Sequence, residues 1–333
     1  MHEKEHIRDI SMHHDDDQAI DTMKKLAVVM SLSVPFVLAA CGSHSDTPQA
    51  PTVGHLYLVS PVNSTIYNYD VGNDDALTLA TTQAMPSSAY GFAIATDPTA
   101  QYAILADNTT GLFYSYTIGA NGVLSTAPTA TSSSPTNSYP SALTFDQTGQ
   151  YFYATNSGSG NNSISEFSVG ANGALTLNTT LDLAGSTPNA ITANPKAPYV
   201  YVVTGNSLIT AYSVGTNGVL AAAAVSSVAA EGASGLVIDQ TGQYAYAATT
   251  AGILEYAIQS NGSLTAVSTP VALTGNPSYS IAIDPTNSFL YVKNANTTNI
   301  QVYSIGVNGV LSALPDLVSP ETNIPSIAMT SHL

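Results

Sequence analysis

Residues 142–176 read ALTFDQTGQYFYATNSGSGNNSISEFSVGANGALT and contain one complete copy of a unit that recurs through most of the chain. The apolar run Ala142–Phe145 is followed by Asp146-Gln147-Thr148-Gly149, in which Asp and Gly are typical turn residues. The next run, Tyr151–Ala154, is continuously apolar, which indicates a strand buried on both faces. The first half of the unit therefore predicts two antiparallel strands.

The second half of the unit predicts a β-hairpin. Residues Ile164–Val169 alternate apolar and polar side chains with a period of two, as in a half-buried strand. Asn172-Gly173 follows, and both residues tolerate the positive φ angles of a type I′ turn. A fourth strand is then expected at Gly173–Thr176.

The hairpin turn recurs about every 46 residues, and helical patterns are almost missing between its copies. Four-stranded units at this period predict an all-β fold, a β-propeller, and counting the units gives six blades. The first unit begins at its second strand, near His55, and the chain ends in a lone first strand, Ser326–Met329. Docking of this strand into the first blade is expected to close the ring and cover its edges. The matching turns are Asp74-Asp75, Asn121-Gly122, Asn217-Gly218, Asn261-Gly262 and Asn308-Gly309.

The units resemble the YVTN-type propellers of the lactonase family, which includes 6-phosphogluconolactonase-like proteins. The resemblance is carried by Tyr153-Ala154-Thr155-Asn156, Tyr201-Val202-Val203-Thr204 and Tyr291-Val292-Lys293-Asn294, and it extends over residues 55–333. It implies a propeller of seven blades, which stands as the alternative to the six counted. It identifies the type of blade more closely than the activity.

The same resemblance implies a lactone-hydrolysing site of Arg, His and Glu near the channel, with a Pro-Arg-His-type stretch entering a first strand. The matching places here read Pro140-Ser141-Ala142 and Pro188-Asn189-Ala190, and no Arg follows Cys41. A phosphorylated sugar lactone is therefore a poor fit as substrate. Whether the chain is an enzyme stays open at this point.

The N-terminal part of the sequence predicts a lipid anchor. Residues 1–22 are a polar extension that precedes the expected start at Met23, and 23–40 combine a basic start with a short apolar stretch. Small residues directly before Cys41 resemble the lipobox of bacterial lipoproteins, which implies acylation of that thiol and a tether at 41–54. Gly42 favours the outer membrane, with the propeller (55–333) periplasmic or surface-exposed. An ordinary signal peptide with a chance Cys is the alternative.

Charge narrows the class of partner. After Cys41 only Lys196 and Lys293 are basic, against fifteen Asp and Glu. Nucleic acid is excluded as a partner, because its phosphates require clustered Lys and Arg, and anionic lipid headgroups are disfavoured. No cofactor is expected, and His55 and His332 without a third ligand are too few for a metal site.

Strand order places the loops between second and third strands, and between fourth and first strands, on one face of the ring. Neutral polar side chains on this face suit a glycan or another neutral ligand, with Tyr rings as stacking surfaces. Alternatively, the Asn residues satisfy loop backbone and the Tyr rings pack between blades. The candidates are Tyr90, Tyr139, Asn156, Asn189, Asn206, Tyr279 and Asn294.

Two residues are the candidates for catalysis. Glu231 lies in an apolar stretch, where desolvation would raise the pKa of its carboxyl and suit it to general acid or base chemistry. Lys293 offers a cation for a lactone carbonyl oxygen. Their alternatives are a solvated loop carboxylate and a surface or paired Lys. Two functions are thus weighed, an envelope-anchored module that binds a protein or glycan, and a hydrolase of neutral lactones.

Overall fold

The computed structural model describes residues 50–86, 91–135, 138–158, 162–267, 270–273, 279–294, 296–320, 322 and 324–331. The predicted extension, signal peptide, Cys41 and most of the tether lie outside the described residues. In the described ranges, no helix is both long and apolar enough to cross a membrane.

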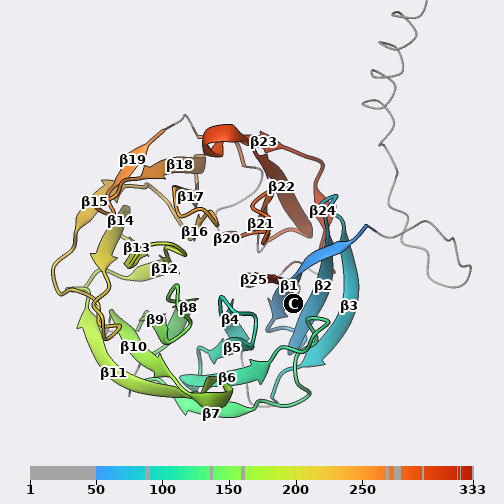
Figure 1. Cartoon of the computed structure of the whole chain (residues 1–333), viewed down its shortest axis with the longest axis horizontal. Coiled ribbons are helices and arrows are strands. Elements are labelled where there is room, and N and C mark those ends of the chain that lie inside the picture. The colour runs from blue at the N-terminus through green and yellow to red at the C-terminus, as the bar shows by residue number, and fades with distance from the viewer. Residues whose placement is uncertain are drawn as a thin grey trace, which may run out of the picture. The chain divides into compact units, whose positions relative to one another are not determined.

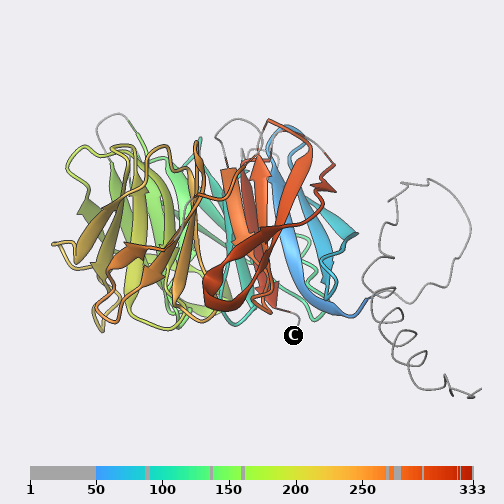
Figure 2. The same ribbon diagram turned by 90° about the horizontal axis from the view of Figure 1, so that it is seen from above.

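The described strands form six antiparallel sheets around a common axis, which confirms the six-bladed β-propeller (Figure 1, Figure 2). From the axis outward, blade 1 contains β25 (Ser326–Ser331), β1 (Thr52–Ser60), β2 (Thr65–Gly72) and β3 (Leu77–Ala84); blade 2 contains β4 (Gly91–Thr96), β5 (Tyr102–Asp107), β6 (Leu112–Thr117) and β7 (Ala130–Ser133). Blade 3 contains β8 (Pro140–Phe145), β9 (Tyr151–Asn156), β10 (Ser163–Val169) and β11 (Leu175–Asp182); blade 4 contains β12 (Pro188–Ala193), β13 (Tyr199–Thr204), β14 (Leu208–Ser213) and β15 (Ser226–Ala229). Blade 5 contains β16 (Gly235–Ile238), β17 (Tyr244–Thr249), β18 (Gly252–Ile258) and β19 (Leu264–Ala266); blade 6 contains β20 (Tyr279–Ile283), β21 (Phe289–Asn294), β22 (Asn299–Ile305), β23 (Leu311–Ala313) and β24 (Leu317–Val318).

The C-terminal strand completes blade 1, as predicted. β25 pairs with β1 antiparallel, with His55 opposite Thr330 and Val59 opposite Ser326. Figure 1 shows β25 beside the axis, next to β1. β1 itself begins at Thr52, three residues before the boundary expected at His55. Blade 1 therefore closes the ring, because its sheet combines β1, β2 and β3 with the C-terminal strand β25.

Hydroxyl groups tie β25 to the two neighbouring blades. The backbone N–H of Ile327 donates to Ser280 Oγ of blade 6 at 2.9 Å. On the other side, the N–H of Ile94 in blade 2 donates to Ser326 Oγ at 3.1 Å, and Thr96 Oγ1 donates to the carbonyl of Met329 at 2.6 Å. The innermost strands have an edge that faces no further strand, and buried N–H and C=O groups there need hydrogen-bond partners. The hydroxyls supply partners for some of them.

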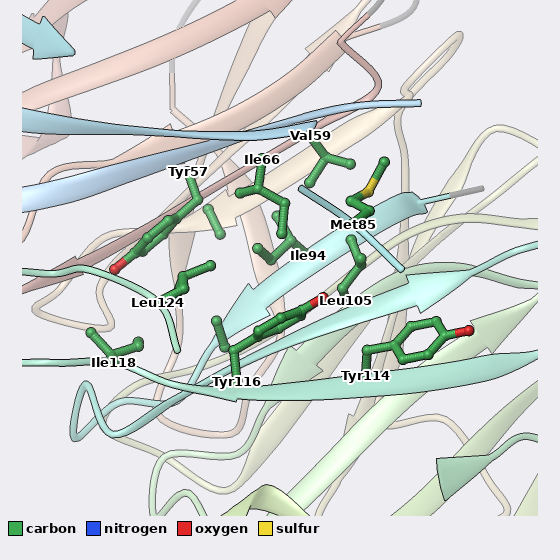
Figure 3. Packing of buried hydrophobic residues seen from close by; sticks show 12 residues of the cluster. Tyr57, Val59, Ile66, Met85, Ile94, Leu105, Tyr114, Tyr116, Ile118 and Leu124 are labelled. Carbon is green, nitrogen blue, oxygen red and sulfur yellow. The ribbon is translucent and has the colours of Figure 1, made fainter. Parts of the chain in front are cut away.

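The hydrophobic core lies between the blades rather than within one of them. Figure 3 shows the cluster between blades 1 and 2, where Tyr57 and Ile66 face Leu105 and Tyr116. All four side chains are fully buried. Alternation along each strand therefore gives every blade two apolar faces, one for each neighbour.

Buried tyrosines on the second strands link four of the six blades to the next one. The Tyr57 hydroxyl donates to the carbonyl of Gly122 at 2.6 Å, and the Tyr153 hydroxyl donates to that of Gly218 at 2.7 Å. Tyr201 and Tyr246 make the same bonds, to Gly262 and Gly309. The repeated Tyr thus fastens the repeated hairpin of the following blade.

We expect Tyr153→Phe to lower the free energy of unfolding by about 1 kcal/mol, because a buried carbonyl loses its donor. Tyr116→Phe is the matched control, since the Tyr116 hydroxyl is buried and has no hydrogen-bond partner among the described residues. Removing that hydroxyl should leave stability unchanged or raise it. Chemical denaturation of both variants measures the two effects, and equal losses would contradict the assignment.

The predicted turn type is right for some hairpins and wrong for others. Asn172 and Gly173 both have positive φ (59° and 73°), as do Asn308 and Gly309, which fits type I′. At Asn121-Gly122 only the Gly has positive φ, and its N–H donates to the carbonyl of Gly119 at 2.9 Å. That pattern belongs to a three-residue loop that ends in a left-handed Gly. Asn217-Gly218 and Asn261-Gly262 share the positive φ at Gly alone.

The fourth strand follows the turn directly in blade 3 but not in blades 2 and 4. In blade 2, an isolated bridge joins Ile118 and Leu124, and β7 starts only at Ala130. The N–H groups of Ser125 and Thr129 donate to the carbonyls of Thr117 and Ser115, so the residues between them bulge out of the ladder. Pro128, which has no N–H, lies in that bulge.

Candidate functional site

A channel of about 420 Å³ runs along the propeller axis, lined by the six innermost strands. One position on these strands carries only small residues, which leaves room at the axis. The next position carries Ile or Leu, which packs into the core between blades and also borders the channel. The small set is Ala93, Ala142, Ala190, Gly235, Ser280 and Ser326, and the aliphatic set is Ile94, Leu143, Ile191, Leu236, Ile281 and Ile327.

Ser and Thr hydroxyls, with the amides of Gln147 and Gln240, give the channel its polar character. Among the described residues, Asp97 and Asp146 are the only charged ones in the lining. Asp97 Oδ1 accepts hydrogen bonds from the N–H groups of Gln101 and Tyr102, both at 2.6 Å. Asp146 Oδ1 accepts one from Tyr151 at 2.9 Å. Both carboxylates thus fix the turns after first strands, as the sequence predicted for Asp at these places. Neither is free to act on a bound ligand.

Glu231 does not lie in the channel. It is exposed in the connection between β15 and β16, and it is not among the residues that line the axis. The apolar residues around it in the sequence are used elsewhere, since Ala230 and Ala233 pack into the core between blades 4 and 5. The desolvation on which its catalytic role depended is therefore not provided by the fold.

Lys293 is fully buried in blade 6 and is also outside the channel lining. Its Nζ donates to the carbonyls of Asn294 at 2.6 Å, Thr297 at 2.5 Å and Thr322 at 3.2 Å. These contacts fasten the loop after β21 to the segment that leads into β25. The fold thus does not bring Glu231 and Lys293 together in the channel.

The predicted ligand-binding residues divide into two groups. Asn156 and Asn294 are buried at the ends of second strands, where Asn156 bonds to the third strand and Asn294 to its own loop. Asn156 Nδ2 donates to Ser165 Oγ at 2.8 Å, and Asn294 Oδ1 accepts from the N–H of Asn296 at 2.9 Å. These Asn side chains thus hold the chain at the strand ends of blades 3 and 6, where the other blades have Ser60, Asp107, Thr204 and Thr249.

Three of the other predicted residues lie at the loop face. Tyr139, Asn189 and Asn206 are exposed there, and none of them lines the channel. Tyr90 lies outside the described residues, and only the backbone of Tyr279 is described, in β20. The loop face is therefore polar, but no described pocket gathers these side chains.

Sequence reasoning missed two buried carboxyl groups between blades. Glu166 is 1% exposed, and its Oε2 accepts the N–H of Leu220 in blade 4 at 3.1 Å. Glu255 holds the N–H of Leu311 in the same way at 3.2 Å. An acidic residue at the middle of a half-buried strand, repeated in two units, was the available signal. Burial raises the pKa of Glu166 to about 7, although the Leu220 hydrogen bond lowers it.

We expect the stability of the protein to fall as pH rises from about 4.5 to 7, because the folded state holds the Glu166 proton more tightly than the unfolded state. Glu166→Gln should remove this component, raising the free energy of unfolding at pH 8 by about 1–3 kcal/mol. Glu231→Gln, at an exposed carboxyl, is the control. Denaturation at pH 5 and pH 8 measures the difference, and parallel pH profiles for wild type and Glu166→Gln would refute it.

No cluster of three or more His, Cys, Asp or Glu that could hold a metal ion occurs within the described ranges. The nearest approach is His55, whose Nδ1 lies 3.0 Å from Asp70 Oδ1 in blade 1. That pair joins directly opposed residues of β1 and β2.

Comparison with solved structures finds the same fold at low sequence identity. A periplasmic gluconolactonase from Pseudomonas aeruginosa is 15% identical, with a TM-score of 0.63 over 82% of this chain and 85% of that one. A protein from Bacteroides fragilis, provisionally assigned as a 6-phosphogluconolactonase, is 20% identical, with a TM-score of 0.58 over 80% of each chain. A chain of the Nidogen/Laminin complex is 14% identical, with a TM-score of 0.62 over 83% of this chain and 98% of that one.

No curated protein sequence matches the chain. The family described as lactonase, 7-bladed beta-propeller, matches it twice, at residues 119–228 and 216–325. Together these stretches cover more than half of the sequence. The chain therefore belongs to this lactonase family of β-propellers, and its described residues form six blades where the family's description gives seven.

Proposed function

We propose that the propeller is a non-catalytic module that binds a neutral polar ligand, such as a glycan, in its axial channel. The observation that carries this proposal is the channel lining. Among the described residues it combines Ser and Thr hydroxyls with Ala and Ile side chains, and it includes two Asp but no Arg, His, Lys or Glu. The lining exposes more polar than apolar surface, so a ligand with several hydrogen-bonding groups fits it better than an apolar one.

The family relationship supports the fold of the proposed module more than its chemistry. At places matching the family's Pro-Arg-His-type stretch, this chain has Pro140-Ser141-Ala142, and Ser141 lines the channel. A similar propeller also occurs in a gluconolactonase and in a protein–protein complex. The fold therefore occurs in both enzymes and binding proteins. Which of the two functions this chain has depends on the side chains at the axis.

A plugged channel tests the proposal. Thr192 lines the axis on β12, and Thr192→Trp would fill the space there, whereas Thr78→Trp places the same ring on the exposed outer strand β3. Binding to an array of neutral glycans, followed by calorimetry on each hit, should show saturable binding that Thr192→Trp weakens at least about tenfold. Thr78→Trp should bind as the wild type does. No saturable hit, or equal behaviour of both variants, rejects the proposal.

The alternative is hydrolysis of neutral lactones, which the family and its gluconolactonase relative favour. In this reading Glu231 would have to act from the exposed connection between β15 and β16. Turnover of a neutral lactone panel that disappears in Glu231→Gln would establish it. Turnover that is not detected, or that is unchanged in Glu231→Gln, removes this form of the hypothesis.

We further propose that a lipid on Cys41 anchors the propeller in the cell envelope, at the outer membrane. Support comes from the order of basic start, apolar stretch and lipobox-like residues before Cys41. Metabolic labelling with a radioactive fatty acid should mark the wild type but not Cys41→Ser. Membrane fractionation should then find Cys41→Ser in the soluble fraction. Equal labelling of both chains would contradict the anchor.

A further inference from the structure

A second cavity of about 290 Å³ lies between blades 3 and 4, on the face that carries the hairpins. One wall comes from the start of blade 3's second strand, with Gln147, Gln150 and Tyr151. The opposite wall comes from blade 4, with Pro198, Tyr199 and Thr216. The cavity shares Asp146, Gln147 and Ala193 with the axial channel. The two cavities are therefore adjacent, but their other lining residues differ.

This cavity borders the one turn between first and second strands that departs from the repeat. In the turns of blades 2, 3, 5 and 6, the fourth residue has positive φ, as at Gly149 (70°) and Gly242 (72°). In blade 4 the corresponding Ala197 does not. Pro198 follows it and has no N–H, so Asn194 Oδ1 accepts from Lys196 at 2.8 Å and Ala197 at 3.0 Å instead. The altered turn therefore forms the blade 4 wall of the cavity.

Two tyrosine rings line the cavity and are held in place without a ligand. A Cβ atom added at Gly218 would lie 2.1 Å from Cδ1 of Tyr151, so this ring rests directly against the Gly218 backbone. The Tyr151 hydroxyl also donates to the carbonyl of Thr216 at 3.4 Å. Tyr199 rests against Gly262 in the same manner. Rings fixed in advance lose little conformational entropy when a ligand binds.

The remaining lining combines apolar residues with neutral polar ones and one carboxylate, that of Asp146. Gln147, Thr148 and Gln150 offer amide and hydroxyl groups. The carboxylate of Asp146 accepts hydrogen bonds from the N–H groups of Tyr151 and Thr148 and from the Thr148 hydroxyl. In blade 4, Asn194 stands where blades 2, 3, 5 and 6 have Asp, so no second carboxylate faces the cavity.

We propose that this cavity is a second binding site, which accepts a pyranose ring of a neutral saccharide. The apolar face of a sugar ring packs on Tyr151 or Tyr199, since an aromatic ring offers a flat apolar surface. Its hydroxyls meet the amides of Gln147 and Gln150 and the carbonyls of the blade 4 hairpin. The volume is at the lower end for small-ligand pockets, which suits one sugar ring rather than a long chain.

The repeat supplies a matched control for the test. Tyr151→Ala removes a wall of the cavity, whereas Tyr244→Ala removes the equivalent ring of blade 5, which rests against Gly309 and lines neither cavity. Pro198→Gln restores the residue found at Gln150 and Gln243 in the matching turns. The probes are maltose, cellobiose and lactose, titrated into the full chain and followed by calorimetry and by NMR line broadening of the sugar.

At least one disaccharide should bind saturably, and Tyr151→Ala should weaken it about tenfold or more, as expected of an aromatic anchor. Pro198→Gln should weaken it too, and Tyr244→Ala should leave it within about twofold. Thr192→Trp, which fills the axial channel, should not change disaccharide binding at this cavity. The proposals for the two sites can therefore be rejected independently. No saturable disaccharide, or an equal loss in Tyr244→Ala, overturns the proposal, and so does a loss confined to Thr192→Trp.

Discussion

Deletion of residues 324–333 should abolish the cooperative unfolding of the propeller. The deletion removes β25, and with it the partner of β1 and the hydroxyl-bonded link between blades 2 and 6. Leu56, Tyr57 and Leu58 of β1 are all 0% exposed and would lose cover on one side. A domain has a free energy of unfolding of only about 5–15 kcal/mol. The free energy lost with one strand of the closing sheet is therefore expected to exceed this total.

Thermal melting followed by near-ultraviolet circular dichroism measures this effect, since the signal reports packed tyrosines. A synthetic peptide of residues 322–333, added in trans, is the control, because it returns the missing strand without any other change. The truncated chain should regain a cooperative transition in its presence. If the truncated chain melts cooperatively by itself, β25 is not required for closure, and the ring is held by other contacts.

Gly218→Ala should lower the free energy of unfolding by about 2–5 kcal/mol, for two reasons that add. Gly218 has a φ of +75°, which costs an L-residue about 1–2 kcal/mol. A Cβ there would also lie 2.1 Å from the Tyr151 ring, and forcing atoms into a packed site costs about 1–3 kcal/mol. Rotation of the ring about its Cβ–Cγ bond does not relieve the clash, because Cγ itself would lie 2.2 Å from the added Cβ.

Gly185→Ala separates the two contributions. Gly185 has a φ of +84°, but no atom lies within 4 Å of its added Cβ, so only the backbone term applies. Urea denaturation of both variants should show a clearly larger loss for Gly218→Ala. Comparable losses would mean that the contact between hairpin and tyrosine adds nothing to stability.

The architecture could be predicted because it depends on local signals that recur. The Asn-Gly turns, the alternation in Ile164–Val169 and the Asp at turns each report on a few neighbouring residues, and the repeat multiplies them. Closure by Ser326–Met329 was predicted from strand counting alone. The turn types at Asn121 and Asn217 were not, because Asn can adopt either sign of φ and the loop length decides which one it takes.

The candidate site was predicted less well, because burial of a single side chain depends on distant parts of the chain. Glu231 stands among apolar residues in sequence, yet Ala230 and Ala233 turn inward and leave it exposed. Lys293 looked like an available cation, but three carbonyls surround its Nζ, one of them from Thr322. Glu166 is buried only because the blade 4 hairpin covers it. The Glu repeated at the middle of a half-buried strand in two units was a signal for this burial, but the hairpin that covers each Glu lies in another blade.

The way β25 and β1 meet has a consequence for how the gene can be rearranged. In blade 3, a short turn joins Phe145 to Tyr151, and in blade 1 the matching ends are Ser331 and Thr52, with Ser331 paired opposite Gly54. A linker of similar length between Ser331 and Thr52 would thus make blade 1 like the others. A circular permutant with that linker, opened before Pro140, would carry six intact blades in one continuous reading order.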